Sequence, residues 1–63
     1  MSDQAPEVSL ARQIASVKRE IALRTRVYPR QIDMKRMTPA EADREIAAMT
    51  AVLHTLMKLE TGS

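Results

Sequence analysis

The stretch that decides the fold covers residues 24–39 and reads RTRVYPRQIDMKRMTP. Pro29 and Pro39 divide it, and residues 7–61 contain no other Pro and no Gly. Because proline lacks a backbone N–H and disfavours helix in the residue before it, Pro29 predicts the end of a helix near Val27. We therefore interpret residues 28–38 as the corner between two helices, either without regular structure or with a short helical turn over residues 30–36.

The residues before this corner predict a first helix over about residues 7–27. Its inward positions recur every three or four residues, which is the spacing of a helical seam: Leu10, Ile14, Val17, Ile21, Arg24 and Tyr28. Arg24 occupies a position where an apolar side chain is expected, and Glu20 lies one helical turn before it, where an ion pair can form. Residues 1–6 are expected to be a disordered N-terminus.

A capping-box pattern after the corner predicts the start of a second helix. Thr38 and Glu41 are spaced so that each side chain reaches the other's backbone N–H, and Pro39 stands at the first helical position. This helix is expected over about residues 39–60, with residues 61–63 frayed. Its seam repeats the spacing of the first: Ala42, Ile46, Met49, Leu53 and Leu56. The fold class is therefore all-α, an antiparallel, coiled-coil-like two-helix hairpin.

The short chain predicts self-association. A domain of 63 residues buries little surface, and this one has no Cys for disulfides and a single His. Neither a metal nor a cofactor is expected, so a second copy is the remaining source of stability. Apolar residues beyond the seam widen the surface of the second helix. The expected homo-oligomer interface comprises Ile46, Met49, Val52, Leu53, Leu56, Met57 and Leu59.

Positive charge gathers around the corner. The whole chain has a net charge of +2, yet residues 18–36 contain seven Lys and Arg against Glu20 and Asp33. Guanidinium groups bind phosphate oxygens well, and a Tyr ring stacks on a nucleobase. The candidate ligand-binding residues are Arg24, Arg26, Tyr28, Arg30, Lys35 and Arg36. The alternatives are a solvated basic turn and a Tyr that only closes the end of the hairpin.

The sequence does not favour an enzyme. It contains no Cys nucleophile and no Gly-rich phosphate loop, and His54 falls on the polar side of the second helix. No apolar run approaches the roughly 20 residues that span a bilayer, and the first ten residues lack the pattern of a signal peptide. A cytoplasmic protein without a membrane partner is expected.

Around the corner the sequence resembles a group of small helical-hairpin proteins of phages and prophages. The shared pattern is an Arg-x-x-Val-Tyr-Pro corner, a basic turn, a Met and a second helix that contains Ala. The matching residues are Arg24, Val27, Tyr28, Pro29, Arg30, Met37, Ala42, Ile46 and Met49. The group's turn has a Gly where this chain has Lys35 or Arg36. The resemblance covers roughly residues 17–59 and implies no particular activity.

Small phage proteins of this kind act by binding. The resemblance, the basic corner and the predicted assembly suggest a non-enzymatic counter-defence protein that sequesters a small anionic ligand, such as a cyclic nucleotide signal, in the host cytoplasm. One alternative is a module that inhibits a host protein through Val52, Met57 and Leu59. Another is weak nucleic-acid binding by the basic corner.

Overall fold

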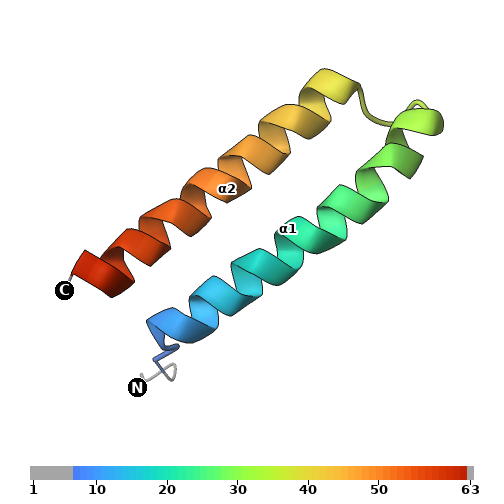
Figure 1. Ribbon diagram of the computed structural model, residues 1–63. Coiled ribbons are helices and arrows are strands. Elements are labelled where there is room, and N and C mark those ends of the chain that lie inside the picture. The colour runs from blue at the N-terminus through green and yellow to red at the C-terminus, as the bar shows by residue number, and fades with distance from the viewer. Residues whose placement is uncertain (1–6, 63) are drawn as a thin grey trace, which may run out of the picture.

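The computed structural model describes residues 7–62, which form two antiparallel helices joined by a short corner (Figure 1). Helix α1 spans Leu10–Asp33 and helix α2 spans Pro39–Gly62. The start of α1 and the end of α2 lie at one end of the molecule, and the corner lies at the other. No strand occurs in residues 7–62. The predicted all-α hairpin is confirmed, whereas the predicted disorder of residues 1–6 falls outside the described residues.

Helix α1 begins at Leu10, three residues later than the sequence analysis expected. Ser9 is its N-cap, and the Ser9 hydroxyl accepts a hydrogen bond of 3.1 Å from the backbone N–H of Arg12. The Gln13 side-chain amide also donates to the carbonyl of Val8, at 2.9 Å. The Ser9 bond satisfies a backbone N–H that a helix start leaves without an intrahelical partner, so Ser9 caps a helix whose first residue is Leu10.

The far end of α1 corrects the sequence interpretation, because the helix does not stop at Val27. It continues through Pro29 to Asp33, so half of the predicted corner is helical. Pro29 is exposed, which leaves room for its ring, while Tyr28 and Ile32 extend the half-buried inward row by another turn. Packing of an apolar row against a second helix stabilises a helix more than single-residue propensity does, so it outweighs the lost hydrogen bond here.

The helix ends instead at a left-handed residue, Lys35, whose φ is 59°. The N–H of Arg36 donates to the carbonyl of Gln31 at 2.9 Å, and the N–H of Lys35 donates to that of Ile32 at 3.0 Å. This bonding pattern is a Schellman motif, whose left-handed position is usually a Gly. The corner contains no Gly, so an L-residue takes this position.

The capping box predicted for α2 is present. The Thr38 N–H donates to the Glu41 carboxylate at 2.8 Å, and the Glu41 N–H donates to the Thr38 hydroxyl at 3.1 Å. Hydrogen bonds from the backbone and hydroxyl of Thr38 lower the pKa of Glu41 below its ordinary value. At the other end, α2 remains helical to Gly62, beyond the residue 60 expected from the sequence.

The two predicted seams face each other. All inward positions of α1 and α2 named from the sequence are half-buried or buried, but only Ile14 and Ala42, exposed by 7% and 6%, are buried among the described residues. The chain measures 43 × 29 × 14 Å, so it is one helical layer thick. Each helix therefore packs one side against the other helix, and no further layer of the described residues covers the two broad sides of the hairpin.

Replacing Lys35 by Gly is expected to stabilise the hairpin. A left-handed conformation costs an L-residue roughly 1–2 kcal/mol, and Gly avoids most of that strain. We expect Lys35→Gly to raise the free energy of unfolding by about 1 kcal/mol, which is about 4–8 °C in Tm for a domain of this size. The change in Tm is measured by thermal unfolding, followed by circular dichroism at one fixed protein concentration. Arg36→Gly is the control and should give no gain; an equal gain in both variants would contradict the assignment.

The capping box predicts a pH dependence of stability. Since the folded-state pKa of Glu41 is lowered, its charge stabilises the fold above the ordinary Glu pKa of about 4.3 and stops doing so as pH falls through the folded-state value. Glu41→Gln should therefore lower Tm at pH 7 and change it much less at pH 3. The control is Glu45→Gln, outside the capping box, which should show no such convergence. An unchanged Tm gap for Glu41→Gln at both pH values would contradict the prediction.

Candidate functional site

The six residues predicted to bind a ligand fall into three separate regions of the hairpin. Successive residues of an α-helix are rotated by about 100°, so residues two apart point to nearly opposite sides. Arg24 and Tyr28 belong to the half-buried inward row, whereas Arg26 and Arg30 are exposed. They lie on the side of α1 that faces away from α2, which we call the outer edge of α1. Lys35 and Arg36 lie in the corner. A single chain therefore does not bring the predicted phosphate and base contacts together.

Arg24 already has an acidic partner. Its guanidinium forms an ion pair and hydrogen bond with the Glu20 carboxylate one turn earlier in α1. This bond is the main reason why the pKa of Arg24 is raised, and Tyr28 contributes less. The Arg24 side chain is 35% exposed, so it reaches solvent along the flank of the inward row. A ligand would have to compete with Glu20 for it.

Arg26 and Arg30 are the pair best placed to hold an anion. They lie one helical turn apart and line a surface depression of about 430 Å³ together with Val27 and Gln31. Neither forms an ion pair with another described residue. The same outer edge carries Arg12 and Arg19 further toward the start of α1, because residues seven apart are rotated by only about 20°.

Lys35 and Arg36 line a second depression, of about 380 Å³, between the end of α1 and the start of α2. Glu41 lines it too, and its carboxylate accepts the Thr38 N–H. The start of α2 is therefore already capped by a negative group of its own chain. An anion bound by Lys35 and Arg36 would meet that carboxylate, which disfavours anion binding at this helix start.

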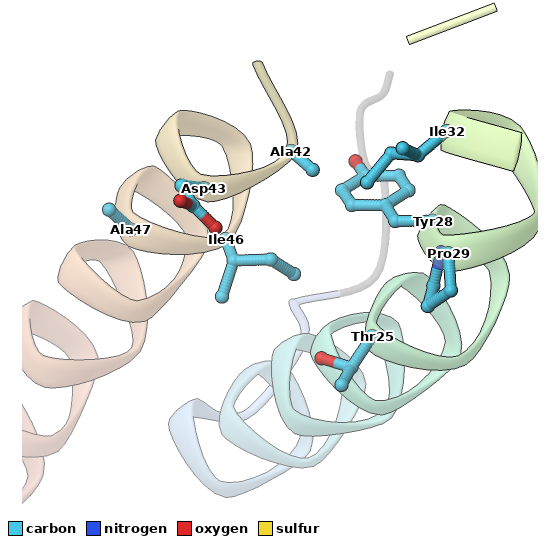
Figure 2. A pocket seen from close by; sticks show the side chains of 8 residues that line it. All are labelled: Thr25, Tyr28, Pro29, Ile32, Ala42, Asp43, Ile46 and Ala47. Carbon is cyan, nitrogen blue, oxygen red and sulfur yellow. The ribbon is translucent and has the colours of Figure 1, made fainter. Parts of the chain in front are cut away.

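Tyr28 lines a groove on one broad side of the hairpin. The groove has a volume of about 440 Å³ and apolar walls. These walls are Tyr28, Pro29, Ile32, Ala42, Ile46 and Ala47. Figure 2 shows the Tyr28 ring extending from α1 across the gap toward Ala42. The polar residues that line the groove are Thr25 and Asp43, and no Lys or Arg lines the groove. We call this side of the hairpin the groove face.

The opposite broad side carries exposed apolar residues from both helices. Val27 is two residues from both Thr25 and Pro29, and Val52 is nine residues from Asp43, so each is rotated by about 160–180° from the groove. By the same reasoning Leu59 joins them, and Leu23 lies where this side meets the outer edge of α1, beside Arg19 and Arg26. We call this side the aliphatic face, and its members are Leu23, Val27, Val52 and Leu59, exposed by 43%, 37%, 47% and 56%.

The predicted oligomer interface is divided by this geometry. Ile46, Met49, Leu53 and Leu56 are half-buried on the side of α2 that faces α1. Val52 and Leu59 are exposed on the aliphatic face, but Met57 lies 14 residues after Asp43 and is rotated by only about 40° from it. Met57 therefore belongs to the groove face. The sequence grouping joined these residues by apolar character, and their rotation separates Met57 from Val52 and Leu59.

The sequence analysis missed four residues that the structure brings forward: Thr25 and Asp43 in the groove, and Leu23 and Val27 on the aliphatic face. Their rotation relative to the seam was readable from their spacing. However, Thr25, Pro29 and Ile32 share one side only if α1 continues past Val27. Because the helix was expected to end there, these three residues were not grouped.

Within residues 7–62, no group of three or more His, Cys, Asp or Glu side chains could hold a metal ion, and neither helix is long and apolar enough to cross a membrane. The chain matches no protein-family model, no curated protein and no solved structure. The resemblance to phage helical hairpins thus stays a prediction.

Proposed function

We propose that this chain is a non-enzymatic binding protein of the phage counter-defence type, whose self-associated hairpins sequester a small anionic ligand such as a cyclic nucleotide. The observation that carries the proposal is the Arg26–Arg30 pair. Both guanidinium groups are exposed, they line one depression, and no described acidic residue pairs with them. Two such groups one turn apart suit the oxygens of a phosphodiester.

Self-association is supported by the thin shape of the hairpin. A layer 14 Å thick, with Ile14 and Ala42 as its buried residues, leaves the aliphatic face open to water. A stable interface buries about 800 Å² on each partner. A broad side of a molecule 43 Å long and 29 Å wide offers an area of that size. A second copy on the aliphatic face would cover Leu23, Val27, Val52 and Leu59.

Assembly also decides how a nucleotide would be held. Tyr28 points away from Arg26 and Arg30 of its own chain, so it does not stack on a base whose phosphate they bind. Contacts to the rest of the ligand would come from another subunit, which makes the proposed site one that forms between chains. Gln31 lines the same depression as Arg26 and Arg30, so its side-chain amide can hydrogen-bond the ligand from the same chain that binds the phosphate.

Two observations favour other partners. The aliphatic face suits a host protein as well as a second copy, which supports the inhibitor alternative. The row of Arg12, Arg19, Arg26 and Arg30 along one edge of α1 suits the phosphate backbone of a nucleic acid.

Assembly is expected to depend on Val52 and not on Met57. These residues are similarly exposed, by 47% and 41%, but lie on different faces. A charge at Val52 would remove an apolar contact of about 1.5–3 kcal/mol, so Val52→Asp should weaken dimerisation about ten- to a hundred-fold. Light scattering after size-exclusion chromatography at micromolar concentration measures the mass, and Met57→Asp is the matched control. A monomeric wild-type protein, or loss of assembly in the control alone, would refute the proposed interface.

Ligand binding is expected to depend on Arg26 and Arg30. Each charge-assisted hydrogen bond contributes roughly 1.5–3 kcal/mol, so Arg26→Ala and Arg30→Ala should each lower affinity about ten- to a hundred-fold. Calorimetric titration with a panel of cyclic nucleotides measures this loss, and Arg12→Ala on the same edge is the control.

Duplex DNA titrated at two salt concentrations separates the nucleic-acid alternative. Tight duplex binding that weakens steeply with salt and with every arginine of the row, Arg12 included, would favour that alternative. Nucleotide binding unaffected by Arg26→Ala and Arg30→Ala would refute the proposed ligand site.

A further inference from the structure

The groove beside Tyr28 has the wrong charge for a phosphate. Its single charged lining residue is Asp43, and every Lys and Arg lies outside the lining. Asp43 forms no ion pair with another described residue. In Figure 2 its carboxylate lies on the α2 side of the groove, beside Ile46 and across from the Tyr28 ring. A carboxylate next to an apolar pocket repels anions and attracts a cation.

The α1 side of the groove adds hydrogen-bond acceptors. Pro29 stands inside α1 and has no N–H, so the carbonyl of Thr25 lacks the donor that normally lies four residues later. The Thr25 hydroxyl makes no hydrogen bond with another described residue, whereas those of Thr55 and Thr61 donate to carbonyls four residues earlier. Thr25, Pro29 and Asp43 all line the groove. Figure 2 shows the Thr25 hydroxyl on the α1 side of this groove.

We infer that this groove is a receptor for an arginine side chain of a partner protein. The apolar walls suit the aliphatic stem, and the Tyr28 ring suits stacking of the planar guanidinium. The Asp43 carboxylate and the Thr25 carbonyl accept the N–H groups at its end. Arginine fits this set better than lysine, because its fork reaches separated acceptors at once while its plane stacks on the ring.

The partner is a different polypeptide rather than a second copy of this chain. The exposed arginines of this chain lie on α1, in the corner and at the start of α2, and none of them lines its own groove. Because these arginines lie outside the groove lining, a contact from one of them to the groove of another copy joins two different surfaces. Such a head-to-tail contact extends into an open chain of subunits unless its rotation closes a ring. The aliphatic face lies on the other broad side, so a partner in the groove leaves that face accessible. This site is independent of the proposed anion site at Arg26 and Arg30.

The test uses Tyr28 as a reporter on the full chain. Tyr28 is the sole Tyr and the chain has no Trp, so its ring NMR signals and its fluorescence both come from the groove. N-acetylarginine methylamide is titrated against the N-acetylnorleucine and N-acetyllysine methylamides and against inorganic phosphate. We expect saturable shifts of the Tyr28 ring with the arginine compound in the millimolar range, weaker ones with lysine, and none with norleucine or phosphate.

Three variants connect those shifts to the groove. Asp43→Asn should weaken arginine binding about ten- to a hundred-fold. Asp33→Asn, an exposed carboxylate outside the groove, is the matched control and should leave it unchanged. Pro29→Ala returns an N–H to the Thr25 carbonyl, so it should weaken binding several-fold while raising Tm. That opposite change in affinity and stability would not arise from general damage to the fold.

Several results would overturn the inference. These are norleucine binding as tight as arginine binding, Tyr28 shifts caused by phosphate, unchanged binding by Asp43→Asn, or no shift with any compound. Light scattering at saturating arginine compound tests the source of the side chain. An unchanged mass supports a different polypeptide, and a fall in mass would assign the groove to contacts between copies. None of these readouts involves Arg26 or Arg30, so they do not depend on the anion-binding proposal.

Discussion

The structure depends on one constraint: two helices in a single layer can each cover only one side of the other. The contact between α1 and α2 buries Ile14 and Ala42, while the rest of the inward row remains partly open. The way the helix ends are stabilised and the exposure of the two broad sides both follow from this small buried area. The helix ends are therefore secured by local hydrogen bonds at Ser9, Lys35 and the Thr38–Glu41 capping box rather than by a core. Both broad sides remain open to solvent, and each carries a different chemistry.

That difference gives the molecule a division of surfaces. The aliphatic face offers apolar side chains, the groove face offers an aromatic ring with acceptors, and the outer edge of α1 offers guanidinium groups. Helical rotation alone produces the division, because neighbouring residues along α1 serve different surfaces. Arg26, Val27 and Tyr28 follow one another in sequence and face the outer edge, the aliphatic face and α2. A cluster of basic residues in the sequence is thus not a cluster in space.

Local patterns in the sequence were sufficient to predict the hairpin, the two seams and the capping box. The spacing of Ile14 or Leu53 and the pairing of Thr38 with Glu41 each involve one turn or one helix, where local rules hold. The prediction was wrong where packing outweighed a local rule. Pro29 was expected to end α1, but Ile32 continues the inward row beyond it, and Lys35 ends the helix without a Gly. The groove went unnoticed for the same reason, since its α1 wall exists only if the helix continues past Pro29.

Pro29 also gives α1 a mechanical property. A helix that lacks one backbone hydrogen bond bends most easily at that place, and Pro-containing turns are where kinks concentrate. The turn after Pro29 carries Ile32 and the Schellman motif and is joined through the corner to the capped start of α2. Thr25 lies before the bend and Ile32 after it, so bending at this point changes the distance between two walls of the groove. A bend at Pro29 would therefore widen or narrow the groove without unfolding either helix.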